Sequence, residues 1–356
     1  MIRVSKITGG VKRVLRQNMG LRAGEALIVI TDTPTDQEWR SQDIEKLEDM
    51  VSRNLLARNI ADIARRGFPK SEVTFQTYPS TGRSSREPSR EVEESMRLFN
   101  VVLAATTYSI SHTDARESAS RSGVRIASMP GVLEEMFYPR GSVTADHDRI
   151  ASETLALTRI LTRASKIKIQ TLAGTDLTMN LGGRQGLADT GLYTEPGSWG
   201  NLPAGEAYLA PVEGTAEGIV IVQRGWVPNL RHNMKLLFEK GRLVRLSGGG
   251  SIGEDLLELL RPGDNRDPYG LRRNLAEFGI GTNPYVRRRD NTLEAEKIRG
   301  TVHVAIGDNS HMGGRVRADV HQDFIVPSPT VEVDGRVLME KGKLDARYIN
   351  SYRHIL

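Results

Sequence analysis

The first 160 or so residues alternate between short apolar runs and longer segments with helical periodicity. The connections between the apolar runs are too long for hairpins, so neighbouring strands are expected to run parallel. This part of the chain is therefore predicted to be an α/β domain, a parallel sheet with flanking helices. The predicted strands are residues 26–31, 73–78 and 101–105, and the predicted helices are residues 11–19, 44–66 and 90–99.

The pattern changes after a strongly periodic helix predicted at residues 150–164. Short strands follow in which charged and apolar residues alternate, and glycine and proline cluster between several of them. Further helices are expected at residues 253–260 and near 274–278. We therefore predict an α/β domain at residues 1–165 and an α+β metal-binding domain at residues 166–356, with a mixed, largely antiparallel sheet.

Composition excludes several classes of protein. The 356 residues include no cysteine, which rules out disulfides, thiolate metal ligands and a cysteine nucleophile. The net charge is +5, but acidic and basic residues are interleaved and aromatic residues make up only 5%, so no nucleic-acid partner is expected. No stretch of about 18 apolar residues and no apolar targeting segment occurs. No membrane partner is expected, and a cytoplasmic location is predicted.

Two predicted strands carry the residues best suited to bind a metal. His321 and Asp323 are separated by one residue in a strand, so both side chains are expected on one face. His303 lies in another strand, where Ala305 and Gly307 share its face and leave room beside the imidazole. If the strands pair, they supply three ligands. A polar strand face and a histidine satisfied within the core are the alternatives.

Two glutamates could complete this site. Glu206 follows a glycine in a loop, where the backbone can approach closely. Glu277 is expected at the end of a short helix that runs into a glycine turn. Either one alone would normally face solvent. With His303, His321 and Asp323 they make five ligands, which fits two divalent ions with a shared water better than one ion.

Two further histidines are candidates for the same region. His112 follows the third predicted strand of the first domain, and ligands gather at the carboxyl ends of parallel strands. It is a candidate for contact with substrate or with a metal ligand, and capping of the next helix is the alternative. His311 lies in a turn between the strands of His303 and His321, from which it could approach the metals.

Several runs in the second domain resemble the thermophilic aminopeptidase (aminopeptidase T) family. They are GTDLTMNLGGR (174–184), GSWGNLPAGEAYLAPVEGTAEG (197–218), NLAEFGIGTNP (274–284), LEAEKIRGTVHVAIGDN (293–309) and HQDF (321–324). The resemblance implies a dimeric, dinuclear metallopeptidase with two Glu, two His and one Asp as ligands. The matching positions are Glu206, Glu277, His303, His321 and Asp323.

One position departs from the aminopeptidase pattern. That family places a tyrosine seven residues after the strand histidine, where this chain has Ser310 beside His311. The chain is also similar to 2,5-dihydroxypyridine dioxygenase, an Fe(II) ring-cleaving enzyme that resembles the same family. This second resemblance implies two His and one Asp as ligands, with a His at the position of Glu277 and no acid at that of Glu206. It also implies a histidine at the position of His112.

We therefore expect an aminopeptidase-like metallohydrolase that cleaves an amide bond in a short peptide or small molecule. Two divalent ions, Zn, Mn or Co with Fe as a further candidate, would activate a shared water near neutral pH. Asp323 is the expected bridging ligand, while Glu206 or Glu277 could bridge or carry a proton. The alternative is a mononuclear Fe(II) dioxygenase that opens a hydroxylated heteroaromatic ring, with His112 as base. A binding protein with a relic site is less favoured, and a homodimer is expected.

Overall fold

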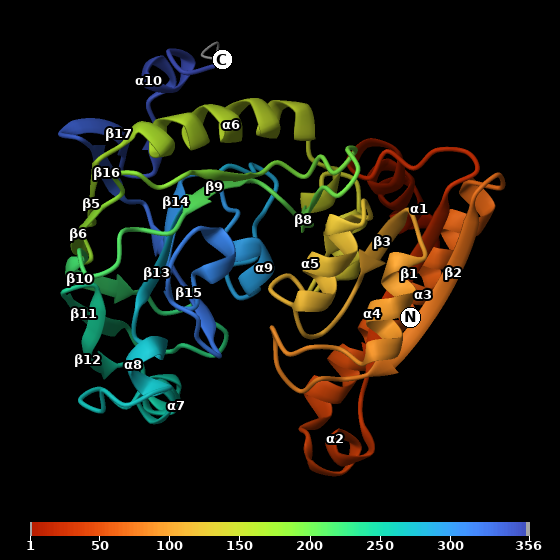
Figure 1. Ribbon diagram of the computed structural model, residues 1–356, viewed down its shortest axis with the longest axis horizontal. Coiled ribbons are helices and arrows are strands. Elements are labelled where there is room, and N and C mark those ends of the chain that lie inside the picture. The colour runs from red at the N-terminus through yellow and green to blue at the C-terminus, as the bar shows by residue number, and fades with distance from the viewer. Residues whose placement is uncertain (1, 354–356) are drawn as a thin grey trace. The chain divides into compact units, whose positions relative to one another are not determined.

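The computed structural model describes residues 2–353, which form two compact units (Figure 1). Unit 1 comprises Met1–His147 with Gly191–Ala204, and unit 2 comprises Asp148–Thr190 with Gly205–Leu356. The division therefore lies at the first residue of helix α6 (His147–Arg163), whereas the sequence places it after this helix, at about residue 165. The reason is that the apolar face of α6 packs into the core of unit 2.

Unit 1 is built on a parallel sheet of five strands in the order β2–β1–β3–β4–β8. The strands are β1 (Ala26–Thr33), β2 (Glu72–Pro79), β3 (Val101–Ala104), β4 (Arg125–Ser128) and β8 (Trp199–Asn201). The helices are α1 (Val4–Arg13), α2 (Asp36–Ser41), α3 (Ile44–Gly67), α4 (Arg90–Arg97) and α5 (Asp114–Arg121). A π-helical turn (Val14–Asn18) continues α1, and two 3-10 turns (Glu134–Phe137 and Ser142–Thr144) precede α6.

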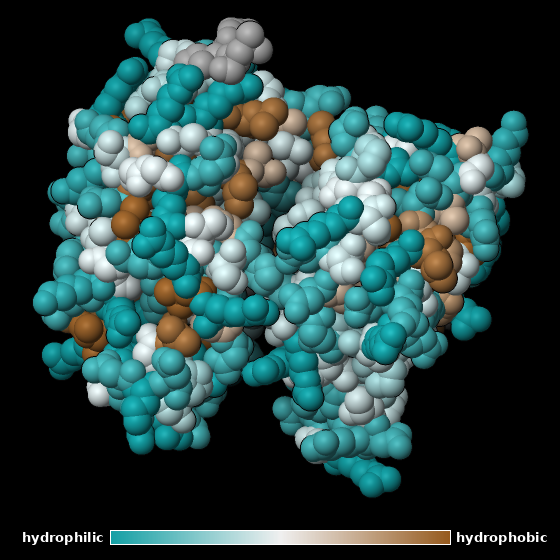
Figure 2. All heavy atoms as spheres, in the orientation of Figure 1, coloured by the Kyte–Doolittle hydropathy of each residue, from teal (hydrophilic) through white to brown (hydrophobic). Residues whose placement is uncertain are grey.

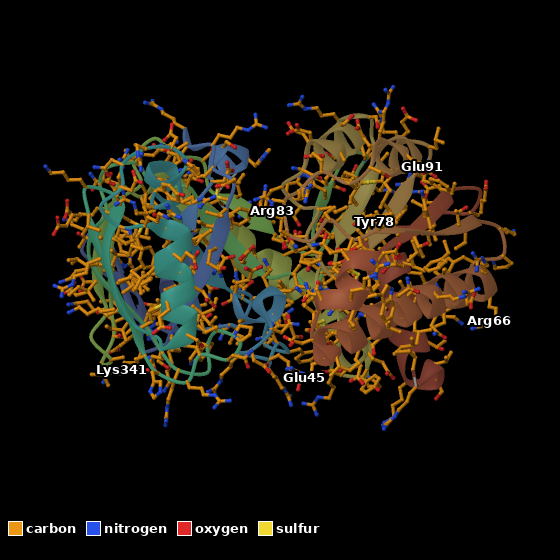
Figure 3. All side chains as sticks on the ribbon, turned by 90° about the horizontal axis from the view of Figure 1, so that it is seen from below. Glu45, Arg66, Tyr78, Arg83, Glu91 and Lys341 are labelled. Carbon is orange, nitrogen blue, oxygen red and sulfur yellow. The ribbon has the colours of Figure 1, made fainter. Side chains whose placement is uncertain are left out.

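Both faces of this sheet are buried, as expected when helices cover a parallel sheet on each side. Val29 and Leu103 point into a cluster with residues of α1 and α3. Ile30 and Val102 point into the opposite cluster, which α4 and α5 cover. Tyr78 of β2, labelled in Figure 3, joins this cluster. The alternation follows from the two-residue period of a strand. The predicted α/β architecture of unit 1 is confirmed.

Unit 2 contains two antiparallel sheets. The larger sheet has the order β12–β11–β10–β6–β5–β16–β17–β18, and the smaller sheet has the order β15–β14–β13–β9–β7. The larger one consists of β5 (Lys166–Gln170), β6 (Asp176–Asn180), β10 (Glu217–Val222), β11 (Met234–Glu239), β12 (Arg242–Gly248), β16 (Thr330–Val333), β17 (Arg336–Glu340) and β18 (Lys343–Leu344). The smaller one consists of β7 (Leu187–Asp189), β9 (Glu206–Leu209), β13 (Leu275–Gly281), β14 (Thr301–Gly307) and β15 (His321–Pro327).

The remaining elements of unit 2 are helical. They are α7 (Ser251–Leu260), α8 (Tyr269–Arg272), α9 (Thr292–Ala295), α10 (Ala346–Asn350) and a 3-10 turn (Ser310–Met312). Together with α6, these elements and the two sheets form the predicted α+β arrangement. On the face shown in Figure 2 hydrophilic side chains predominate, and the hydrophobic ones form small separate groups. Within residues 2–353, none of the helices is long and apolar enough to cross a membrane.

The smaller sheet has two chemically different faces. Phe278, Val304 and Phe324 point from one face into the apolar core of unit 2. The expected short helix near residues 274–278 is wrong, because these residues begin β13, the middle strand of the sheet. Leu, Ala and Glu favour a helix locally, but pairing with β9 and β14 on both sides overrides that preference. Alternate residues of this strand therefore face away from the core, and Glu277 is one of them.

Candidate metal centre

The five predicted ligands come together on four adjacent strands of the smaller sheet. Strands β9, β13 and β14 each carry one of them, and β15 carries two that are separated by one residue. Residues paired in an antiparallel sheet point to the same side. The pairs in the sheet place all five on the face opposite the apolar core. The residues are Glu206, Glu277, His303, His321 and Asp323.

Small residues between the ligands make this convergence possible. Gly279 pairs with His303, and a Cβ atom at Gly279 would lie 2.2 Å from the imidazole ring. Ala305 of β14 pairs with Asp323 on one side and with Glu277 on the other. The expectation that small residues flank His303 is met on its own strand. Gly279, on the neighbouring strand, is the residue over which the ring lies.

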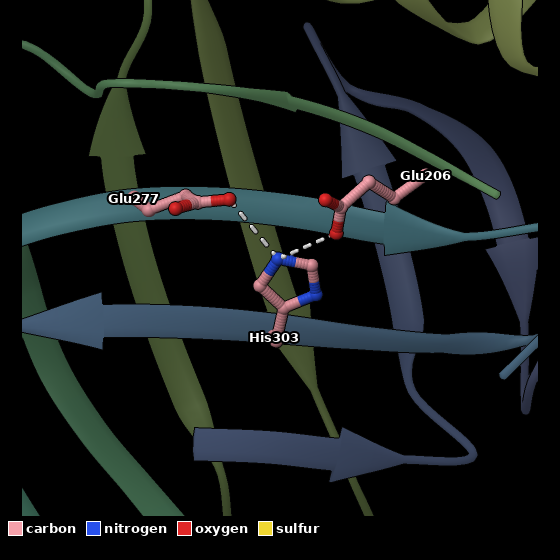
Figure 4. Close-up of side chains that lie close together, drawn as sticks. All are labelled: Glu206, Glu277 and His303. Atoms are coloured by element: carbon pink, nitrogen blue, oxygen red, sulfur yellow. Dashed lines mark hydrogen bonds and ion pairs between the residues drawn. The ribbon is translucent and has the colours of Figure 1, made fainter. Parts of the chain in front are cut away.

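Glu206, Glu277 and His303 form what we call the first group (Figure 4). His303 Nε2 lies 3.1 Å from Glu277 Oε1 and 3.3 Å from Glu206 Oε2. All three side chains are buried, and His303 is only 1% exposed. Among residues 2–353, no hydrogen-bond partner reaches the buried Nδ1 of His303. Packing and the hydrogen bond between Nε2 and Glu277, rather than one at Nδ1, therefore orient this imidazole.

Glu277, His321 and Asp323 form the second group. His321 Nε2 lies 3.1 Å from Glu277 Oε2 and 3.6 Å from Asp323 Oδ1. The other ring nitrogen of His321, Nδ1–H, donates to the carbonyl oxygen of Asp308 at 2.8 Å. This bond fixes which nitrogen faces the carboxylates. Metal-binding histidines are typically oriented in this way, by a hydrogen bond from the nitrogen that does not bind the metal.

Glu277 belongs to both groups, and in each group the candidate ligand atoms lie within 4.8 Å of one another. Asp323, the expected bridging ligand, belongs to the second group only. The difference follows from the sheet order, because β13 lies between β9 and β14 whereas β15 is at the edge. Glu277 is therefore the carboxylate in position to connect the two groups.

A buried lysine that the sequence analysis does not single out lies beside the first group. Lys297 follows α9, is 1% exposed, and its Nζ donates to Glu206 Oε1. The same nitrogen lies 2.8 Å from Glu296 Oε1 and 3.6 Å from Asp189 Oδ2. A lysine in the run Leu-Glu-Ala-Glu-Lys is typical of a solvated face. The available signal is its position, four residues before the first residue of β14, the strand that carries His303.

Tyr208 is a second residue that sequence reasoning misses. It pairs with Gly279 from the side opposite His303, so the phenol and the imidazole flank the same glycine on one face of the sheet. Burial, with the nearby charge of Glu206, raises the pKa of the Tyr208 hydroxyl above its ordinary value. The hydroxyl is therefore protonated at neutral pH and available as a donor.

Carboxylates dominate the electrostatics of the site. Burial raises the pKa of Glu206, and it raises the pKa of Glu296 to about 8. Burial alone would also raise the pKa of Glu277, but hydrogen bonds from His303 and His321 lower it. Burial opposes protonation of His303, yet the same carboxylates raise its pKa to about 9. Protonated imidazoles thus balance part of the negative charge of the carboxylates, which a bound divalent cation would otherwise neutralise.

This donor set fits a divalent metal ion. Two imidazoles and several carboxylates converge in a buried place, and the second group has a histidine already oriented for binding. Carboxylate and imidazole ligands accept Mn, Fe, Co and Zn alike. The residues therefore support a metal at this site and leave its identity open.

The three remaining candidates belong to neither group. His112 is in unit 1, half-buried in the segment between β3 and α5, whereas the ligands belong to unit 2. Its role as a base stays a prediction. Ser310 donates to the Asp308 carboxylate at 3.0 Å and thereby supports the residue that orients His321. His311, the next residue, is half-buried and belongs to neither group.

Comparison with known proteins identifies the family. The family model of 2,5-dihydroxypyridine 5,6-dioxygenase (NicX) matches residues 7–346. The chain belongs to this family. A relative, the 2,5-dihydroxypyridine 5,6-dioxygenase of Pseudomonas putida, is 25% identical over 263 residues, which are 68% of this chain and 71% of the relative.

Two solved structures share the fold. The structure of the Pseudomonas putida 2,5-dihydroxypyridine dioxygenase has a TM-score of 0.73 at 17% identity and covers 97% of this chain and 99% of its own. Wild-type AmpT from Thermus thermophilus has a TM-score of 0.63 at 18% identity and covers 96% of this chain and 99% of its own. At these identities the likeness concerns the fold alone. Both resemblances noted in the sequence are thus supported.

The family overturns the expected activity. The expectation of an aminopeptidase-like metallohydrolase acting on peptide or amide bonds is wrong, because the family match and the relative are those of a ring-cleaving dioxygenase. The error arises because Glu206 and Glu277 match the aminopeptidase ligands, and ligands determine which ions bind rather than which reaction follows. A metal remains supported, whereas the binding of two ions is not shown. The homodimer stays a prediction.

Proposed function

We propose that this chain is a metal-dependent dioxygenase that opens a hydroxylated N-heteroaromatic ring of the 2,5-dihydroxypyridine type. The observation that carries the proposal is the family match over residues 7–346, which spans both units of the fold. The convergence of imidazoles and carboxylates on the smaller sheet supports it, because oxygenases of this kind hold iron with histidines and carboxylates.

Glu277, His321 and Asp323 would hold an Fe(II) ion, which supplies the one-electron chemistry that allows O₂ to react with an electron-rich ring. His321 is preset for this role by its bond to Asp308. Glu277 stands where the dioxygenase resemblance implies a histidine. The second group therefore offers two carboxylates and one imidazole, which gives it more negative charge than two imidazoles and one carboxylate would.

Ring opening also requires protons to leave the ring hydroxyls, because the deprotonated ring is the better electron donor. We propose His112 as the base, as the dioxygenase resemblance implies. His112→Gln should then lower kcat by roughly 10²- to 10⁴-fold, the usual contribution of a general base, while the metal content stays unchanged. A loss of bound metal in this variant, or an unchanged kcat, would count against the assignment.

The proposal is tested by oxygen consumption. Protein stripped of metal is reloaded with Fe(II) under argon and mixed with 2,5-dihydroxypyridine, and O₂ uptake and loss of the ring absorbance are followed after air is admitted. We expect uptake to track ring loss one for one, both oxygen atoms of ¹⁸O₂ to enter the product, and no reaction under argon. Asp323→Asn is the control that removes a proposed ligand. Iron-loaded protein that consumes no O₂ with any dihydroxypyridine isomer would refute the proposal.

A further inference from the structure

A carboxylate from an earlier part of unit 1 caps the helix that follows His112. Glu87 lies in the connection between β2 and α4, and it accepts from Asp114 N at 2.7 Å and from Ala115 N at 3.1 Å. These two residues begin α5. The first N–H groups of a helix have no partner within the helix, and negative charge is favourable at this end. Glu87 therefore supplies part of the cap from a distant position in the sequence.

Thr113 completes this cap and places His112 beside it. As the N-cap residue of α5, Thr113 accepts from Arg116 N at 3.2 Å, and its hydroxyl donates to Ile110 O at 2.8 Å. The first three N–H groups of α5 are thus all bonded. His112 is the residue directly before the N-cap. The path of the backbone at His112 therefore depends on how the start of α5 is held.

The connection between β2 and α4 also contacts the segment before His112. This connection consists of residues 80–89, which we call the strap. Ser85 N donates to Ser109 O at 2.9 Å, and Ser109 N donates to Ser84 Oγ at 3.1 Å. The strap is therefore bonded to the chain on both sides of His112.

A second carboxylate holds the same segment, but it belongs to the interior of unit 1. Asp32, in β1, is 1% exposed and accepts from Thr107 N at 2.6 Å and from Tyr108 N at 3.2 Å. Its removal would leave N–H groups without a partner in a partly buried place and would destabilise the unit. Glu87 is exposed, so its carboxylate can be removed while the interior stays intact. The strap is thus the support of His112 that mutation can test separately from folding.

We propose that Glu87 is a positioning residue for His112, whose imidazole it holds in place by capping α5 from the strap. The inference rests on the role of His112 as base in the proposed function, and it deepens that role. Without the carboxylate, two N–H groups at the start of α5 must bond to water, and the residue before the cap is less well fixed. A base must lie within hydrogen-bond reach of the proton that it accepts, so a small displacement slows proton transfer.

Kinetic measurements on the iron-loaded protein test this role. Glu87→Ala should lower kcat for 2,5-dihydroxypyridine by roughly 10- to 100-fold, the size of effect that a displacement of about 1 Å can have. The KM and the iron content should stay unchanged. Glu87→Gln keeps a carbonyl oxygen as acceptor and should recover part of the loss. Glu91→Ala, which removes an exposed glutamate of α4 (Figure 3), is the matched control and should have the wild-type kcat.

The His112→Gln background distinguishes positioning from a general structural role. If Glu87 acts through His112, adding Glu87→Ala to His112→Gln should lower kcat no further, because the group being positioned is already absent. A full additional loss in the double variant would overturn the proposal, as would an unchanged kcat in Glu87→Ala alone.

A measurement without turnover separates this inference from the proposed function. In Glu87→Ala, amide hydrogen exchange at Asp114 and Ala115 should become faster, and the NMR signal of the His112 imidazole should shift. Glu91→Ala should show neither change. A chain that opens no ring but shows both changes would refute the proposed function and leave the positioning of His112 supported. A ring-opening chain whose His112 signal and kcat are unaffected by Glu87→Ala would refute the role of Glu87 alone.

Discussion

The two groups of the candidate metal centre share Glu277 but are held in different ways. In the first group His303 is buried over Gly279, has no described hydrogen bond at Nδ1, and lies next to a glutamate engaged by Lys297. In the second group a backbone carbonyl orients His321, which also lies 3.1 Å from Glu277 Oε2. The comparison shows that a set of donor residues does not by itself define a metal site. We therefore expect the surroundings of each donor to set how tightly each group binds a metal ion.

Replacing one histidine in each group should show most clearly whether the two groups bind metal independently. His321→Ala should lower Mn²⁺ affinity by more than the roughly 10- to 100-fold that accompanies loss of an outer hydrogen bond, because it removes a ligand. His303→Gln should retain one ion, since the second group is intact. Calorimetric titration of both variants measures the difference. Equal losses in the two variants would mean that the groups act as one site.

Gly279→Ala tests how closely the ring of His303 packs against β13. The added methyl would lie 2.2 Å from the imidazole, so the ring must move or the strand must yield. Overpacking of this kind typically costs about 1–3 kcal/mol of unfolding free energy. Gly182→Ala is the matched control, since a Cβ there meets nothing within 4 Å. Urea unfolding of both variants provides the measurement, and equal stabilities would contradict the tight contact.

Asp308→Ala tests the support of the second group. The Asp308 carboxylate accepts from Ser310 N at 3.1 Å and from Ala318 N at 2.9 Å, which fixes the loop whose carbonyl orients His321. Loosening this loop should weaken Mn²⁺ binding by roughly 10- to 100-fold, as for other outer-sphere partners. Asp334→Ala removes a similar carboxylate that accepts from backbone N–H groups at β5, and it should leave metal affinity unchanged. A similar loss in both variants would indicate a general effect on stability.

Local patterns predict unit 1 well and the smaller sheet of unit 2 less well. Strands β4 and β8 and helices α2 and α5 are not among the predicted elements. Strands β1 and β3 are apolar on both faces, and helices α3 and α4 have clear periodicity, so each of these elements can be recognised by itself. Strand β13 cannot, because its helix-favouring residues form a strand only through the partners on either side. Those partners are distant in sequence, and pairing of this kind leaves no local signal.

The candidate ligands are predictable for a different reason. His321 and Asp323 share a face because a strand has a period of two, and this holds in any context. Lys297 escapes prediction, since its burial depends on Asp189 and Glu206, which come from other strands. Residues able to bind a metal can thus be found from local spacing. Whether a charge is solvated or buried depends on tertiary structure.

Glu213 gives the smallest expected effect and a dependence on pH. It accepts from Asn309 Nδ2 at 3.0 Å and from Arg315 N at 2.8 Å, and it pairs with Arg184, so it ties down the loop that begins at Asp308. Partial burial would raise the pKa of Glu213, but these hydrogen bonds and the charge of Arg184 lower it below its ordinary value of 4.5.

The sign of the pH effect follows from that lowered pKa. The folded state keeps Glu213 ionised at pH values where the unfolded chain binds a proton, so the stabilisation is fully present above about pH 4.5 and is lost as the pH falls further. Glu213→Gln should therefore reduce the unfolding free energy by about 1.5 kcal/mol at neutral pH, the size of a hydrogen bond to a charged group, and by much less in acid. Urea unfolding across this pH range measures the difference in unfolding free energy between wild type and Glu213→Gln, with the exposed Glu258→Gln as control. A difference in unfolding free energy that stays constant down to low pH would show that the charge of Glu213 does not hold the loop.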